Sequence, residues 1–340
     1  MRTLVISDLH LGARLRRDVL RHPAAQAALL DALEGIDRLV LLGDVVELME
    51  GRQRQALAIA EPVLRALGAR LGAGREVVLV PGNHDRPLVR PWLRHNGALL
   101  TIDAAVPADS GPLLARIASW LAPAEVSVRY PGVWLSDRVW ATHGHYLDRH
   151  LLPESAYGVL RRTPQDGRVS VHDYERGRRP SAARVESTLT RWLPRPLAAL
   201  ADDGAEWLRA ATMPSVPRRL QAHRIAPLTV RVLGTQMQRA SIPALARVVH
   251  RLGVDADFVI FGHVHRLGPL PEDDAVLWQA PNGGPGIVNS GAWTYEKLLL
   301  HGAGPPHAYW PGGAVYLDGA GPPRALGLLE HLDAAALGRG

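Results

Sequence analysis

The chain has 340 residues, 47% of them hydrophobic, which is enough to bury a substantial core in one large domain or two smaller ones. Its formal net charge is +6 and comes almost entirely from arginine, because Lys297 is the only lysine. The absence of cysteine excludes disulfide bonds, thiolate zinc sites and a cysteine nucleophile.

Short strands alternate with helices in the first part of the chain. The sequence predicts strands over residues 3–6, 39–42 and 77–80, and apolar spacing predicts helices over residues 24–33 and 53–71. This alternation is typical of an α/β fold, which places its site at the carboxyl ends of the strands. The first strand leaves no room for a signal peptide and the apolar runs are too short to cross a bilayer, so we expect a cytoplasmic protein.

Later strands are shorter and are separated by turn residues. They are predicted over residues 126–130, 133–135, 139–142, 258–261, 276–279, 286–289, 314–317 and 325–328. Apart from the strand over 258–261, which precedes a polar block, we expect those after residue 125 to form a second, mixed sheet. Between them, helices are predicted over residues 181–192, 196–211, 228–238 and 242–252. The predicted organisation is a core of residues 1–149 and 253–340 interrupted by a helical cap insertion, 150–252.

Five short polar blocks lie at strand ends or beside glycines. They read Ser-Asp-Leu-His-Leu-Gly at 7–12, Gly-Asp at 43–44, Gly-Asn-His-Asp at 82–85, Thr-His-Gly-His at 142–145 and Gly-His-Val-His at 262–265. Residues two apart after a strand point the same way, which suits paired ligands such as Asp8 and His10. Asn83 offers a neutral oxygen, and Asp85 a charge that could orient His84. Each block alone is a common accident, but the ordered set predicts two metal ions and hydrolysis at phosphorus.

The ordered set resembles the calcineurin-like metallophosphoesterase superfamily. The resemblance implies a four-layer α-β-β-α sandwich of two mixed sheets flanked by helices. It also implies that one ion is held by Asp8, His10, Asp44 and His265, and the other by Asp44, Asn83, His143 and His263. His84 would then be catalytic, with Asp85 orienting it. Within the superfamily, Gly-Asp-Val-Val-Glu-Leu at 43–48 and the insertion are most similar to UDP-2,3-diacylglucosamine pyrophosphatases, which cleave a pyrophosphate in a lipid precursor.

The expected reaction is attack of a metal-activated hydroxide on a phosphodiester or pyrophosphate of a small nucleotide-type or nucleotide–lipid substrate. Mixed Asp, Asn and His ligation suits Mn²⁺, Fe²⁺ or Zn²⁺, and the family favours Mn²⁺. The alternative is a nuclease acting on DNA or RNA. The intact ligand set argues against a non-catalytic scaffold. An anionic small molecule is the expected partner, nucleic acid is the second candidate, peripheral membrane contact is left open, and no obligate protein partner is inferred.

The insertion carries the positive charge of the chain. Residues 149–251 contain 18 arginines against 8 aspartates and glutamates, an excess of ten positive charges. This excess indicates either an anion-facing surface or a solvated helical one, and the apolar helix faces there fit either an acyl chain or packing on the core. We expect substrate contacts from His145, Asn289, Arg161 and Arg162; Asn289 precedes Ser-Gly in a block similar to the late loop of the family.

Overall fold

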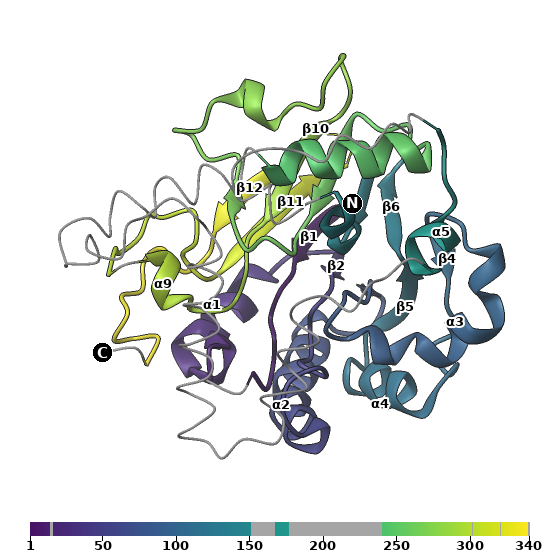
Figure 1. Cartoon of the computed structure of the whole chain (residues 1–340). Helices are drawn as coiled ribbons and strands as arrows, with labels where there is room; N and C mark the ends of the chain where they lie inside the picture. Colours follow the sequence, from purple (N-terminus) through teal and green to yellow (C-terminus); the bar gives the residue numbers. More distant parts are fainter. Residues whose placement is uncertain (14–15, 151–166, 177–239, 301, 320, 339–340) are drawn as a thin grey trace, which may run out of the picture.

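Two β-sheets packed face to face carry the polar blocks. The computed structural model describes residues 1–13, 16–150, 167–176, 240–300, 302–319 and 321–338. The larger sheet has seven strands in the order β12-β11-β1-β2-β3-β5-β4, and the smaller has five in the order β6-β7-β8-β10-β9. Figure 1 shows the helices α1, α2 and α4 on the outer side of the larger sheet.

Ten strands lie within two residues of the bounds expected from sequence, whereas the two-residue strands β4 and β9 were not predicted. The strands of the larger sheet are β1 Arg2–Ile6, β2 Arg38–Leu41, β3 Glu76–Leu79, β4 Ala104–Ala105, β5 Glu125–Tyr130, β11 Gly313–Asp318 and β12 Arg324–Gly327. Those of the smaller sheet are β6 Gly132–Ser136, β7 Val139–Thr142, β8 Phe258–Phe261, β9 Leu267–Gly268 and β10 Gly286–Ser290.

Each sheet has a parallel centre and antiparallel margins. In the larger sheet β1, β2, β3 and β5 run parallel, with β11 antiparallel to β1 and β4 antiparallel to β5. In the smaller sheet β7, β8 and β10 run parallel. The polar blocks therefore follow the carboxyl ends of parallel strands in both sheets, as expected of α/β sheets.

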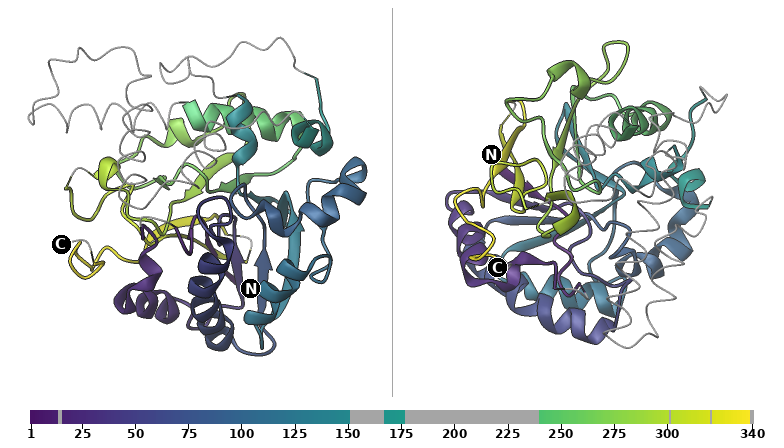
Figure 2. Two further views of the ribbon diagram at one scale, coloured as in Figure 1. Left: turned by 60° about the horizontal axis from the view of Figure 1, so that its bottom comes forward. Right: turned by 60° about the vertical axis from the view of Figure 1, so that its left-hand side comes forward.

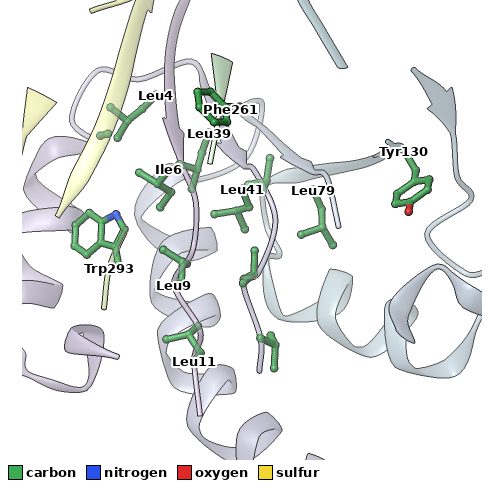
Figure 3. Packing of buried hydrophobic residues seen from close by; sticks show 14 of the residues in the cluster. Leu4, Ile6, Leu9, Leu11, Leu39, Leu41, Leu79, Tyr130, Phe261 and Trp293 are labelled. Carbon is green, nitrogen blue, oxygen red and sulfur yellow. The ribbon is translucent and has the colours of Figure 1, made fainter. Parts of the chain in front are cut away.

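The core has two layers because strand side chains alternate between faces. Leu4, Ile6, Leu39, Leu41 and Leu79 belong to the cluster that also contains the buried helix residues, and Figure 3 shows them beside α2 and the neighbouring strands. The alternate positions form a separate cluster that draws on both sheets and thus fills the space between them. It consists of Val5, Val40, Leu42, Val78, Val80, Val133, Leu135, Val139, Ala141, Ile260, Val288, Val315 and Leu317.

Helices cover the outer faces and complete the four layers. They are α1 Pro23–Ala32, α2 Gln53–Leu71, α3 Arg90–Asn96, α4 Pro112–Trp120, α5 Val171–Arg176 and α9 Lys297–Leu300, and residues 240–252 are also helical. Ile242 and Leu245 of that last helix share a cluster with Val259 and Phe261, and both views in Figure 2 place it on the side of the smaller sheet. The predicted two-sheet α/β fold is confirmed. None of the helices in the described ranges has the length and hydrophobicity needed to span a bilayer.

Two expectations about strands were wrong. Strands β5, β11 and β12 lie in the larger sheet rather than the second one, because β5 pairs with β3 and β11 with β1. Residues 276–279, expected to be a strand, instead overlap the 3₁₀ helix Ala275–Trp278. The Asp274 side chain accepts a hydrogen bond from the backbone N–H of Val276 at 3.0 Å, and this local cap favours the turn.

Of the predicted cap insertion, only residues 150, 167–176 and 240–252 are described. Helix α5 and the helix over residues 240–252 fall within it. The predicted helices over residues 181–192, 196–211 and 228–238 lie outside the described residues. The domain boundaries therefore stay a prediction.

We expect the change Leu41→Ala to lower the free energy of unfolding by about 2–5 kcal/mol, because a fully buried leucine leaves a cavity. Leu277 is 38% exposed and serves as a matched control. Its replacement by alanine should change the free energy of unfolding by less than about 0.5 kcal/mol. Urea unfolding followed by circular dichroism measures both, and equal losses would contradict the assignment of Leu41 to the core.

Candidate metal centre

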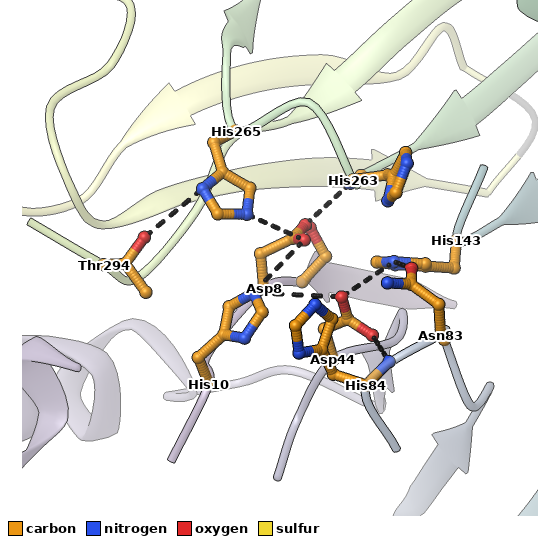
Figure 4. Close-up of polar contacts among 12 residues, drawn as sticks. Asp8, His10, Asp44, Asn83, His84, His143, His263, His265 and Thr294 are labelled. Carbon is orange, nitrogen blue, oxygen red and sulfur yellow. Dashed lines mark hydrogen bonds and ion pairs between the residues drawn. The ribbon is translucent and has the colours of Figure 1, made fainter. Parts of the chain in front are cut away.

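All seven predicted metal ligands meet where the two sheets end together. Asp8 and His10 follow β1, Asp44 follows β2 and Asn83 follows β3. From the smaller sheet, His143 follows β7, and His263 and His265 follow β8. Figure 4 shows these side chains pointing toward one another across the gap between the strand ends.

The ligand loops have an unusual backbone conformation. Seven non-glycine residues have a positive φ among those described, and five of them are predicted ligands. These are Asp8 at 55°, His10 at 42°, Asp44 at 51°, His263 at 69° and His265 at 58°. Each such residue costs about 1–3 kcal/mol, and residues of this kind concentrate at functional sites. The local conformation therefore supports a functional rather than a structural role for these loops.

Glycines permit the close approach of the loops. Gly43 has a φ of 88°, and a Cβ at this position would collide with the imidazole ring of His143. A Cβ at Gly262 would collide with the side chains of Ser7 and Asp8. These glycines let strand ends of the two sheets converge within reach of one ion.

The first group of ligands consists of Asp8, His10 and His265, with one donor atom from each within 4.8 Å of the others. Asp8 Oδ1 lies 3.3 Å from His265 Nε2 and 4.0 Å from His10 Nε2. Asp8 Oδ2 accepts hydrogen bonds from the Ser7 hydroxyl and, at 2.9 Å, from the backbone N–H of His263. One carboxylate oxygen is thus used to fix the loop, while the other faces the two imidazoles.

The second group consists of Asp44, His143 and His263, again with one donor atom from each within 4.8 Å of the others. Asp44 Oδ2 lies 3.2 Å from His143 Nε2 and 3.8 Å from His10 Nε2. Asn83 Oδ1 lies 3.1 Å from His143 Nε2. Asp44 therefore faces ligands of both groups, which is the geometry expected of a bridging carboxylate.

The donor set fits divalent metal ions. Among the described residues, Asp8 Oδ1 and His10 Nε2 are buried and have no hydrogen-bond partner, although buried polar atoms are normally paired. These two atoms face the middle of the first group. Carboxylate, amide and imidazole donors without thiolate suit Mn²⁺, Fe²⁺ or Zn²⁺.

Electrostatics hold the carboxylates ionised and the histidines basic. Burial favours the neutral form of Asp8, but His265 and His143 lower its pKa to about 2. Burial likewise opposes a charge on His143, but Asp44 and Asp8 raise its pKa to about 9. The pKa of Asp44 is well below its usual range because the imidazoles of His143 and His84 outweigh the effect of burial. The carboxylates and the imidazoles thus stabilise each other's charged forms.

His84 is held by a carboxylate that was not among the predicted site residues. Its Nδ1 lies 2.7 Å from Oε2 of Glu47, the same oxygen that contacts His10 Nδ1 at 3.0 Å. The other oxygen of Glu47 accepts the backbone N–H groups of Met49 and Glu50 at 2.9 Å each. Burial would lower the pKa of His84, but Glu47 and Asp44 raise it to about 10. Glu47 therefore lies beside the His84 ring as its counter-ion and favours its protonated form.

The carboxylate of Asp85 binds backbone groups, and its expected role in orienting His84 stays a prediction. Both of its oxygens accept backbone N–H groups, from Val45 at 2.8 Å and from Gly82 at 2.5 Å. Burial and the nearby Asp44 raise the pKa of Asp85 to about 6. Asp85 connects the loops after β2 and β3, whereas Glu47 lies beside the His84 ring.

The structure describes two of the four expected substrate contacts, Asn289 and His145. The Asn289 amide donates to the carbonyl of Gly262 at 2.8 Å and accepts from the N–H of Gly291 at 2.9 Å, so it fixes the loop that carries His263. This side chain is buried, and its expected contact with substrate stays a prediction. His145 is buried beside His143, with ring centroids 5.6 Å apart. Arg161 and Arg162 lie outside the described residues.

Outer contacts complete the site. The hydroxyls of Ser7 and Ser290 lie 2.7 Å apart behind Asp8, and Asp148 Oδ1 lies 2.7 Å from His263 Nε2. Glu296 Oε1 lies 3.8 Å from His265 Nδ1. Such partners orient metal-binding histidines. Glu47 carried a sequence signal, since it follows Asp44 by three residues, whereas Glu296 lay in no recognisable motif.

Metal affinity at the second group is expected to rise with pH. An imidazole must lose its proton to bind a metal, and His143 has a pKa raised to about 9. Below that pH each ion bound displaces a proton from His143, which predicts up to about tenfold tighter binding per pH unit. Calorimetric titration with Mn²⁺ at about pH 7 and about pH 8.5, in buffers of different ionisation enthalpy, measures affinity and proton release. Binding without proton release would contradict the prediction.

The change Glu47→Gln is expected to lower turnover of bis-p-nitrophenyl phosphate by about 10- to 100-fold, because it removes the negative charge beside His84 and His10. Glu61→Gln, at a helix-surface ion pair with Arg65, is the matched control and should leave turnover unchanged. Metal content is measured for each variant, to separate loss of ions from loss of the His84 counter-ion. Full turnover with full metal content in Glu47→Gln would refute the role given to Glu47.

Comparison with known proteins places the chain in a family. The solved structures it is similar to include a cold-active protein-tyrosine phosphatase of a psychrophilic Shewanella species, at 14% identity and a TM-score of 0.29, covering 93% of this chain and 75% of that one. A mutant of a cold-active protein tyrosine phosphatase gives 15% identity and a TM-score of 0.28, covering 93% and 75%. No curated protein sequence matches the chain. The sequence model of the calcineurin-like phosphoesterase family matches residues 1–267. The chain belongs to the calcineurin-like phosphoesterase family and is a metal-dependent phosphoesterase.

Proposed function

We propose that the protein is a dinuclear-metal-dependent hydrolase of phosphodiesters or pyrophosphates, acting on a small nucleotide-type or nucleotide–lipid substrate. The metal ligands in this proposal are Asp8, His10, Asp44, Asn83, His143, His263 and His265. His84 is the catalytic residue, and Mn²⁺ is the preferred ion, with Fe²⁺ and Zn²⁺ as alternatives.

The observation that carries the proposal is the position of Asp44 and His84 between the two ligand groups. One group contains Asp8, His10 and His265, another contains Asp44, His143 and His263, and His84 joins His10 and Asp44 in a third. Seven donors from both sheets are more than a single ion needs. Two adjacent ions that share a carboxylate would use all seven.

When bound, a pair of divalent ions supplies charge neutralisation at phosphoryl oxygens and lowers the pKa of water. The residues of the chain position the groups that react around this pair of ions. His84 is held by Glu47, and its pKa of about 10 keeps a proton on the ring at neutral pH. A protonated imidazole beside the phosphoryl group can stabilise developing negative charge and give its proton to the leaving oxygen.

The proposed substrate class rests on charge and on sequence similarity. Residues 149–251 carry an excess of ten positive charges, which suits a substrate with more than one phosphate group. After Gly43-Asp44 the chain continues Val-Val-Glu-Leu, similar to the UDP-2,3-diacylglucosamine pyrophosphatases, so a nucleotide-linked lipid head group is the first substrate to test. With such a substrate we propose a cytoplasmic enzyme that makes peripheral contact with a membrane.

A nuclease is the alternative, favoured by the same arginine excess, which could follow a phosphate backbone. The two differ in salt dependence. Binding of a polyanion weakens steeply with salt as counterions are released, whereas hydrolysis of a small pyrophosphate does not show this slope.

A metal-reconstituted activity panel tests the proposal. The substrates are bis-p-nitrophenyl phosphate, p-nitrophenyl phosphate, UDP-sugars, a UDP-linked lipid and single-stranded DNA. We expect turnover of the diester and of at least one pyrophosphate to exceed that of the monoester. Asp44→Ala is expected to abolish metal-dependent turnover, because Asp44 faces both ligand groups.

Each other outcome has a stated meaning. Preference for the monoester over every diester would overturn the proposed substrate class. Fastest turnover of DNA, with a steep salt dependence, would favour the nuclease. Undiminished turnover by Asp44→Ala would refute the dinuclear site itself.

A further inference from the structure

The carboxylate of Glu175 joins three separate parts of the chain. Glu175 lies in α5, within the segment between His145 and His263. Its Oε1 accepts hydrogen bonds from the hydroxyls of Tyr130 at 2.6 Å and Tyr146 at 2.7 Å. Its Oε2 accepts from Arg86 Nε at 3.1 Å and also contacts the Arg86 terminal nitrogen. The Glu175 side chain is only 8% exposed, so these contacts are shielded from water.

Two of the three partners belong to ligand loops. Arg86 directly follows the block that contains Asn83 and His84, and Tyr146 directly follows His145 in the block that contains His143. Asn83 and His143 themselves lie 3.1 Å apart, between Asn83 Oδ1 and His143 Nε2. One carboxylate therefore holds together the two loops whose ligands meet in the second group.

The hydrogen bonds that the Glu175 carboxylate accepts are strong ones. Hydrogen bonds to an ionised carboxylate are roughly twice as strong as neutral ones, and Arg86 contacts Glu175 through two of its nitrogens. Tyr146 is further fixed by its ring, which stacks on Tyr174 at 4.9 Å and contacts His145 edge-on at 4.6 Å. These ring contacts fix the direction of the Tyr146 hydroxyl. A change at Glu175 therefore acts on the loop of His143 through Tyr146.

The first ligand group has a different support. Asp8 and His10 follow β1 and His265 follows β8. Their side chains contact Ser7, Glu47 and Thr294, respectively. The contacts of Glu175 with Arg86, Tyr130 and Tyr146 lie on the other side of the centre, with the loops after β3 and β7. A change at Glu175 therefore acts first on the second group, although Asp44 contacts ligands of both groups.

We propose that Glu175 is a positioning residue for the ion held by Asp44, Asn83, His143 and His263, and that through Glu175 the helix α5 sets the affinity of that ion. This inference rests on the proposed dinuclear site. It adds that a helix of the segment expected to choose the substrate also controls one of the two metal positions.

The test is a Mn²⁺ titration of the full chain carrying Glu175→Gln, which keeps the size of the side chain and removes its charge. The wild-type chain should bind two ions. In the variant we expect one binding step to be unchanged and the other to weaken by about 10- to 100-fold. At limiting Mn²⁺, the electron paramagnetic resonance signal of a coupled manganese pair should be replaced by that of a single ion.

Two further variants keep the result interpretable. Tyr146→Phe removes one hydrogen bond and keeps the ring stacking, so it should fold even where Glu175→Gln does not, and it should weaken the same step by a smaller factor. Glu272→Gln, at an exposed position, is the matched control and should leave both steps unchanged.

Unchanged binding of both ions in Glu175→Gln and Tyr146→Phe would overturn the inference while leaving the proposed function intact. Equal weakening of both steps, with a lower melting temperature of the metal-free protein, would show a general structural role and would also overturn it. A wild-type chain that binds a single ion would instead refute the dinuclear site, and this inference with it.

Discussion

The buried carboxylate of Asp44 is the charge around which the site is arranged. Moving an ionised carboxylate out of water costs several kcal/mol unless partners compensate it. Its Oδ1 accepts the backbone N–H of His84 at 2.8 Å, and its Oδ2 faces His143 at 3.2 Å and His10 at 3.8 Å. These partners come from the ends of β1, β3 and β7, so both sheets must converge for Asp44 to be stable as an anion. The low pKa of Asp44 and the high pKa of His143 are two consequences of this one arrangement.

Bringing the strand ends of the two sheets together costs free energy, which the rest of the fold offsets. Five ligand residues have a positive φ, and the approach of the loops requires glycine at 43 and 262. Such strain persists only where the surrounding structure determines the conformation. Here the surroundings are two parallel sheet centres, packed on each other through residues such as Val5, Val40 and Ile260. The rigid strands end just before the strained loops, which explains why the strain gathers at a single edge of the molecule.

The sequence predicted which of these side chains meet because their positions follow from local rules. Asp8 and His10 come two residues apart after a strand, and a parallel sheet brings the carboxyl ends of its strands to one edge. Positions that depend on contacts between distant segments were predicted less well. Asp85 is next to His84 along the chain, whereas Glu47 is next to it in space. Only the direction of the loops decides which carboxylate meets the His84 ring. Strand β11 was placed in the wrong sheet for the same reason, since its pairing with β1 spans most of the chain. Glu175 lies in no motif, so its contacts with Arg86 and Tyr146 could not be foreseen.

The chemistry and the choice of substrate are usually assigned to separate parts of an enzyme, with a rigid core for one and variable loops for the other. If the arginine-rich segment chooses the substrate, as proposed, the separation is incomplete in this chain. Helix α5 belongs to the arginine-rich segment that follows the His143 block, yet its Glu175 binds the residue next to the His84 block and the residue next to His145. A change that moved α5 to suit another substrate would also move Arg86 and Tyr146, and with them Asn83 and His143. Substitutions in this segment should therefore be limited by the geometry of the metal centre as well as by the shape of the substrate, and the limit acts through a single buried carboxylate.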